Sequence, residues 1–202
     1  MPDDRPLSFQ LVFGVAFLWA AIVGARAAKR AVRVHGGSIN QLANEARGLV
    51  AVRATLGLVF YAALGGWLFA PHAFAWAYLS VPSALRWTSA LLLVPTLAFF
   101  TWSYATLGSN YRGGIGLYDG HVLVTRGPYA IVRHPIYLAF IVIMLLALPL
   151  TANWVIGTSG LALVSLIALV RIPQEERQLH ERFDAAWAAY ASRTRCLLPW
   201  YV

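Results

Sequence analysis

The fold of this chain is decided by two apolar runs and the turn between them: IYLAFIVIMLLALPL at 136–150, TAN at 151–153, and WVIGTSGLALVSLIALV at 154–170. Neither run alternates apolar and polar residues as the strands of a membrane barrel would, so we predict a hairpin of two helices. A helix over 136–150 is about 22 Å long, whereas the hydrocarbon core is about 30 Å thick. The hairpin therefore either stops short of crossing the bilayer or thins the bilayer around it.

Composition extends this interpretation to the whole chain. Of the 202 residues, 59% are hydrophobic and only 12% are charged, where a soluble domain carries about 25% charged residues. Three further apolar runs are long enough to cross a membrane as helices. We therefore predict an all-α, polytopic membrane helix bundle with about five transmembrane helices and no second domain. The spans are expected at about 8–25, 49–70, 84–106, 136–151 and 154–170.

The net charge of +8 is a topology signal. If successive spans alternate in direction, 14 of the 16 Lys and Arg residues fall on one side of the membrane, and Arg5 and Arg86 fall on the other. The positive-inside rule makes the basic side cytoplasmic, with the N-terminus outside and the C-terminus inside. We expect contacts with membrane lipids and no nucleic-acid partner, because no binding motif accompanies the charge. The abundance of Arg over Lys and the many Ala residues suggest a bacterial inner-membrane protein.

The C-terminal tail is predicted to form a cytoplasmic amphipathic helix. Leu179, Phe183, Trp187 and Tyr190 recur at helical spacing, with charged residues between them. This helix either lies on the membrane surface or packs under the membrane part. The single cysteine, Cys196, excludes an internal disulfide and is interpreted as an incidental thiol. No His or Cys spacing indicates a metal site, so no metal is expected.

Two polar clusters flank the predicted hairpin and can meet on the same side of the bilayer. The first, GPYAIVRHPIY at 127–137, ends where the helix begins. Pro135 suits the first helical position, and His134 is then expected to cap the helix. The free N–H groups beyond the proline form an anion site, with Arg133 at its mouth and Tyr137 in the first turn. The alternative is an interfacial anchor with an ordinary helix start.

The second cluster, RIPQEE at 171–176, supplies carboxylates. Glu175 and Glu176 either complement the dipole of a helix that starts after Pro173, or one of them faces inward and pairs with a cationic ligand group. Arg171 could neutralise a buried carboxylate or hold an acidic substrate. His121 is a candidate proton carrier or a bystander. An anion pocket beside carboxylates would accept a zwitterion.

At this point the chain resembles the isoprenylcysteine carboxyl methyltransferase family, within the phospholipid methyltransferase superfamily. The resemblance rests on HVLVTRGPY at 121–129, RHPIY at 133–137 and EERQL at 175–179, and it covers about 107–200. It implies a membrane methyltransferase that uses S-adenosyl-L-methionine. It also implies that residues 107–202 bind the cofactor. The three helices within 1–106 lie outside the resemblance, and we expect them to hold the acceptor. The cofactor contacts it implies are Gly127, Pro128, Tyr129, Arg133, His134, Pro135, Tyr137, Glu175 and Glu176, and it assigns Arg171 to orienting the acceptor, with His121 as a candidate base.

The resemblance leaves the acceptor open. Ala139 stands where the family often has glycine, and Asp184-Ala185-Ala186-Trp187 departs from its more acidic pattern. We expect a lipophilic small-molecule acceptor, either like a prenylcysteine carboxylate, or phenolic, or another small lipid. Two other functions stay possible on the residues alone. One is an NADPH-dependent membrane reductase related to sterol reductases, and the other is a non-enzymatic lipid-binding membrane protein.

Overall fold

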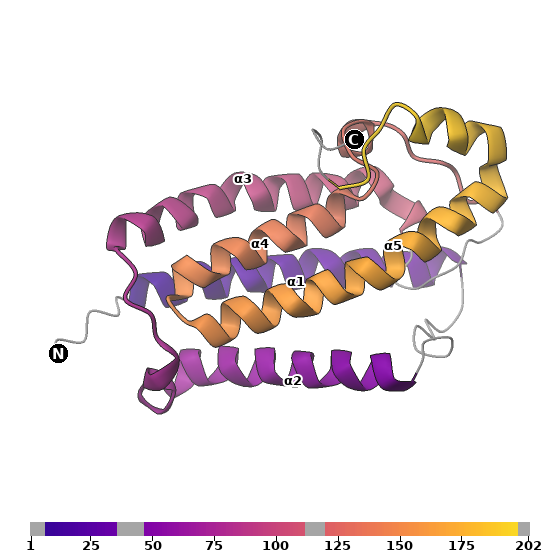
Figure 1. The fold of residues 1–202 in the computed structure, drawn as a ribbon. Helices are drawn as coiled ribbons and strands as arrows, with labels where there is room; N and C mark the ends of the chain where they lie inside the picture. Colours follow the sequence, from indigo (N-terminus) through magenta and orange to yellow (C-terminus); the bar gives the residue numbers. More distant parts are fainter. Residues whose placement is uncertain (1–6, 36–46, 112–119, 198–202) are drawn as a thin grey trace.

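Five helices surround one apolar core (Figure 1). The structure, a computed structural model, describes residues 7–35, 47–111 and 120–197. Within these residues, isolated β-bridges pair Tyr78 with Asn153 and Val132 with Arg195, and no strand is present. The helices are α1 (Leu7–His35), α2 (Arg47–Phe69), α3 (Ser83–Leu107), α4 (Pro135–Thr151) and α5 (Trp154–Ala191), with 3₁₀ turns η1 (Pro71–Ala77), η2 (Gly108–Asn110) and η3 (Gly127–Ala130).

The predicted polytopic membrane bundle is confirmed. The helices α1, α2, α3 and α5 are each long and apolar enough to cross a membrane, and α4 is a shorter apolar helix beside them. The two predicted runs do form an antiparallel hairpin, α4 and α5, which packs between α3 and α2 (Figure 1). The short span is therefore a real feature of the fold, and it places both open ends of the hairpin at one end of the bundle.

The tip of the hairpin is buried, and its backbone groups are paired with side chains. Ala152 adopts the left-handed conformation (φ 50°) that ends α4, and Asn153 Oδ1 accepts a hydrogen bond of 3.1 Å from the backbone N–H of Ile156 to cap α5. Arg86 Nε donates to the carbonyl of Leu150 at 3.2 Å, with its guanidinium over the ring of Phe9. These contacts satisfy helix-end groups that have no water to bond in an apolar setting.

Two helices are longer than predicted. The helix α1 continues through the basic run to His35, because Arg, Lys and Ala are good helix formers and this segment does not need to be apolar to stay helical. The helix α5 continues through Pro173, so no separate tail helix starts there. A proline removes one hydrogen bond of the helix, and in this case the helix is not broken.

The actual break in α5 is at Asp184, whose φ of 39° lies outside the helical region. Asp tolerates positive φ better than most residues do. Beyond the break, Trp187 and Tyr190 are buried, and the Tyr190 hydroxyl donates to the carbonyl of Tyr129 at 2.7 Å. The tail therefore packs against the membrane part, which is one of the two predicted arrangements. The predicted extended piece at 121–125 forms no strand, and residues 1–6 and 112–119 lie outside the described residues.

Candidate functional site

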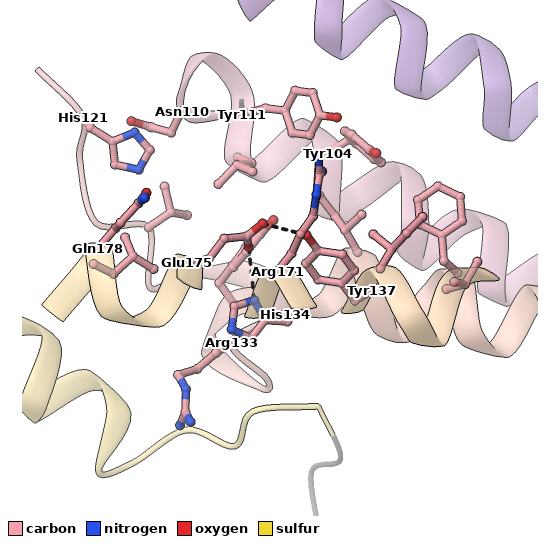
Figure 2. A pocket seen from close by; sticks show the side chains of 18 of the residues that line it. Tyr104, Asn110, Tyr111, His121, Arg133, His134, Tyr137, Arg171, Glu175 and Gln178 are labelled. Carbon is pink, nitrogen blue, oxygen red and sulfur yellow. Dashed lines mark hydrogen bonds and ion pairs between the residues drawn. The ribbon is translucent and has the colours of Figure 1, made fainter. Parts of the chain in front are cut away.

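The two polar clusters meet at the open end of the hairpin (Figure 2). Glu176 Oε1 accepts hydrogen bonds from Arg133 Nε at 2.8 Å and His134 Nε2 at 3.1 Å. The Tyr137 hydroxyl donates to Glu175 Oε1 at 2.6 Å. His134 Nδ1 lies 3.7 Å from Glu175 Oε2, so the imidazole stands between the two carboxylates. We call Arg133, His134, Tyr137, Arg171, Glu175 and Glu176 the charged end.

His134 stands at the N-cap position of α4, as predicted. Its ring makes no hydrogen bond to the helix N-terminus and turns to the glutamates, because a charge-assisted contact is stronger than a neutral cap. The backbone N–H of His134 donates to the carbonyl of Cys196 at 3.1 Å. Pro135 is buried at the first position of α4, as predicted.

A C-terminal strap, residues 190–196, holds the segment before α4 in place. The backbone N–H of Arg133 donates to the carbonyl of Arg195 at 2.7 Å, and Arg133 Nη1 donates to the carbonyls of Ala191 and Thr194. Arg133 therefore joins the strap to Glu176. The sequence analysis missed this role of the strap, because a stretch without regular secondary structure shows no periodic pattern.

Cys196 lies beside His134 and Glu176 of the charged end. The sequence analysis interpreted it as an incidental thiol in the tail and did not predict this position. Its Sγ and ligand atoms of His134 and Glu176 all lie within 4.8 Å of one another. Arg133 also bonds the carboxylate of Glu176. Its positive charge would repel a metal ion bound by these three residues. Burial and the nearby Glu176 carboxylate together raise the pKa of the Cys196 thiol.

A cavity of about 470 Å³ opens beside the charged end, within the range of small-molecule sites. Seven of the eleven predicted site residues line it: His121, Tyr129, Arg133, His134, Tyr137, Arg171 and Glu175. The other four predicted residues do not line the cavity. Gly127 adopts a φ of 60° to start η3, Pro128 and Pro135 are buried, and Glu176 braces Arg133 and His134.

The two glutamates face different ways. Glu175 lines the cavity and Glu176 does not, as expected for adjacent helical residues about 100° apart. The Tyr137 hydroxyl bonded to Glu175 is also in contact with Arg171 (Figure 2). Glu175 is thus the carboxylate placed to meet a cationic ligand group.

His121 enters the cavity from another side. It lies beside Asn110 and Gln178, away from the pair of Tyr137 and Glu175 (Figure 2). The backbone N–H of Val122 donates to Asn110 Oδ1 at 2.9 Å, which ties this segment to the end of η2. His121 therefore shares the cavity with the charged end.

Several lining residues were not predicted. Tyr104 and Tyr111, whose ring centroids are 5.0 Å apart, line the cavity beside Arg171. Burial raises the pKa of the hydroxyls of Tyr111 and Tyr129, so both stay protonated. Phe17 from α1 and Phe60 from α2 reach the cavity from the N-terminal half. Nothing in the sequence pattern distinguishes these aromatic residues from others that face lipid.

The fold and the site define a polytopic helical membrane protein in which a charged cavity opens at one end of the bundle. The family model of the isoprenylcysteine carboxyl methyltransferase (ICMT) family matches residues 89–181. The match includes both polar clusters, so the resemblance seen in the sequence is confirmed.

Individual proteins similar to this chain include a curated enzyme and a solved structure. Methanethiol S-methyltransferase 1 of Bradyrhizobium diazoefficiens is 38% identical over 72 residues, which are 36% of this chain and 24% of that protein. The chain thus matches about a quarter of that relative's length. The solved structure of the eukaryotic intramembrane Ras methyltransferase ICMT superposes with a TM-score of 0.57 at 20% identity, covering 94% of this chain and 66% of that one. At this identity the likeness concerns the fold.

Proposed function

We propose that this protein transfers the methyl group of S-adenosyl-L-methionine to a lipophilic small-molecule acceptor at the cytoplasmic face of a bacterial inner membrane. One observation carries the proposal: a single cavity joins the charged end to apolar side chains deep in the bundle. A zwitterionic cofactor needs the charged end, and a lipophilic acceptor needs the apolar side chains. The family match over 89–181 and the likeness to an S-methyltransferase support the same conclusion.

The residues present fit the cofactor. The amino-acid part of S-adenosyl-L-methionine carries a carboxylate and an ammonium, beside a sulfonium. Glu175 faces the cavity and would meet a cationic group, while His134 and the N-terminus of α4 would meet the carboxylate. Tyr129, Tyr137 and Trp187 would supply aromatic surface. Glu176 would hold His134 and Arg133 in position without touching the ligand.

When bound, the cofactor would supply an electrophilic methyl group: the acceptor's nucleophile gains the methyl, the sulfonium becomes a neutral thioether, and a proton is released only if the acceptor binds in its protonated form. The protein's share is to place the acceptor in line and to exclude water. Arg171 would orient an anionic nucleophile, such as a thiolate or a carboxylate. His121 would take up a proton from an acceptor that binds in its protonated form. We place the acceptor against residues of both halves of the chain, because Phe17 and Phe60 line the cavity with α4 and α5.

Binding of the demethylated cofactor, S-adenosylhomocysteine, tests the site. In Glu175→Gln and in His134→Ala, calorimetry on protein in lipid nanodiscs should give at least a tenfold weaker affinity, about 1.4 kcal/mol. Glu181→Gln and His180→Ala are matched controls, because both side chains are exposed on the same helix. They should bind as the unchanged protein does.

Affinity that is unchanged in both site variants would contradict the proposal. Gel filtration and circular dichroism of each variant show whether it is folded, so that a loss of binding is not confused with a loss of structure. NADPH, titrated in the same way, should give no binding heat.

A further inference from the structure

The cavity extends from the charged end along one face of the α4–α5 hairpin. On α5, Arg171, Ile167, Val164 and Gly160 line it at spacings of four, three and four residues. At 1.5 Å per residue, these positions cover about 16 Å of helix. On α4, Tyr137, Phe140 and Met144 line it at spacings of three and four. We call the part lined by Phe140, Met144, Gly160, Val164 and Ile167 the apolar arm.

Three helices contribute the lining residues at the deep end of the arm. Phe60 of α2, Met144 of α4 and Gly160 of α5 all line the cavity, and the side chains of Phe60 and Met144 are only 3% and 5% exposed. A Cβ atom built on Gly160 would lie 2.6 Å from Met144 Sδ and 2.8 Å from the ring of Phe60. Not even a methyl group fits there without displacing a neighbour. We call Phe60, Met144 and Gly160 the floor.

Phe60 is itself packed against two other aromatic rings. Its ring centroid lies 5.9 Å from that of Phe17 on α1 and 5.2 Å from that of Tyr61. Aromatic pairs at such distances contribute stabilisation beyond their buried area. The floor is therefore supported by neighbouring rings, and it does not yield easily to a group that presses on it.

We propose that the floor sets the length of the apolar tail that the methyl acceptor can carry. This inference rests on the proposed function, because it takes the acceptor's reactive atom to lie at the charged end. Each methylene of a tail that is buried in the arm adds about 0.8 kcal/mol of affinity, or about fourfold. A methylene that goes beyond the floor has to displace packed side chains, which is unfavourable. The acceptor is then a compact or short-tailed lipophile.

The test uses straight-chain alkanethiols, from methanethiol to dodecanethiol, as acceptors for protein in nanodiscs with methyl-labelled S-adenosyl-L-methionine. In the unchanged protein, kcat/KM should rise about fourfold per methylene and then fall at a cut-off length. Phe60→Ala should move the cut-off to longer tails, and Gly160→Ala should move it to shorter ones. Leu64→Ala is the matched control, because Leu64 is buried on the same helix and does not line the cavity. Partition of the thiols into lipid is the same for all variants.

A second measurement does not need methyl transfer. Alkanethiols with a terminal diazirine are photolysed on protein saturated with S-adenosylhomocysteine, and mass spectrometry locates the label. Tails near the cut-off length should label Met144 or Phe60, and Gly160→Ala should remove that label.

The two failures are distinguishable. If no thiol is methylated but Met144 or Phe60 is labelled, a thiol is the wrong acceptor nucleophile, and the inference that the floor limits the tail length is retained. A cut-off that is the same in Phe60→Ala and Gly160→Ala as in the unchanged protein would overturn the inference. So would labels that gather in the apolar groove between α1 and α3, at Trp19 or Trp102.

Discussion

At the scale of single residues, the charged end works as two layers. Glu175 faces the cavity, and Glu176 stands behind His134 and Arg133. Removing the carboxylate of Glu176 would leave a half-buried arginine without its charged partner, which is costly. This explains how one of two adjacent acids can serve a ligand while the other keeps the surrounding side chains in place.

Cys196 offers a probe of this inner layer. Because burial and the Glu176 charge raise the pKa of its thiol, the thiolate fraction at neutral pH is smaller than for an ordinary cysteine. We expect slow alkylation by iodoacetamide at pH 7, rising steeply as the pH is raised through that elevated pKa. Glu176→Gln should accelerate the reaction at pH 7, because the loss of the negative charge lowers the pKa. Intact-mass spectrometry measures the rate, and it sees one site, because the chain has a single cysteine.

An electrostatic cause can be separated from a change in access. At a pH where the thiol is fully ionised, the rates of the two proteins should converge. Rates that differ by the same factor at every pH would show that Glu176→Gln has simply exposed the thiol. Glu181→Gln, on the exposed face of α5, should leave the profile unchanged.

At the scale of the elements, the short helix α4 sets the position of the site. Its length fixes how far His134, just before it, lies from the buried turn at 151–153. That turn is held by Arg86 of α3. Its Nε donates a hydrogen bond to the carbonyl of Leu150 in α4, and its guanidinium lies over the ring of Phe9 in α1. The arginine therefore links α1, α3 and α4 at the end of the bundle opposite the charged end (Figure 1).

Arg86→Met should destabilise the protein by about 2 kcal/mol, because it leaves a buried carbonyl without its charged donor. The apparent Tm in nanodiscs should fall, while S-adenosylhomocysteine affinity at low temperature stays within about twofold, since the charged end is far from the change. Arg177→Met, on an exposed position of α5, should leave the Tm unchanged. An equal Tm for both variants would show that the Leu150 contact contributes nothing.

At the scale of the whole molecule, the distribution of basic residues predicts the orientation in the membrane. The α4–α5 hairpin returns to the side from which it starts, so the charged end and the C-terminal strap lie on the same side. The positive-inside rule predicts that this side faces the cytoplasm, where S-adenosyl-L-methionine would be available to the cavity.

Reporter fusions in a bacterial host test this orientation. A fluorescent protein joined to the C-terminus should fluoresce, and an alkaline phosphatase joined there should be inactive, because phosphatase folds only outside the cytoplasm. The same reporters placed between α2 and α3, at Pro71, should give the reverse result. An active C-terminal phosphatase would invert the topology and place the charged end on the wrong side for a cytoplasmic cofactor.

The sequence by itself determined the class of fold and the polar residues of the site. Apolar runs without alternation can satisfy their backbone in lipid only as helices, and the return of the 136–170 hairpin brings residues 133–137 and 171–176 to the same side. Local pattern also predicted Pro135 at the start of α4 and the buried face of the tail. The local pattern predicted the end of α1 too early and a helix start at Pro173. Local propensity cannot show that α5 stays helical through Pro173.

Only the tertiary structure decided which residues surround the cavity and in what roles. Phe17 and Phe60 look like any lipid-facing aromatic residue until α1 packs beside α4 and α2 packs beside α5. The carbonyls of the strap carry no local signal, because their partner Arg133 is about 60 residues away in sequence. The choice between Glu175 and Glu176 depends on the rotation of α5 about its axis, and that rotation is set by packing against α2 and α4.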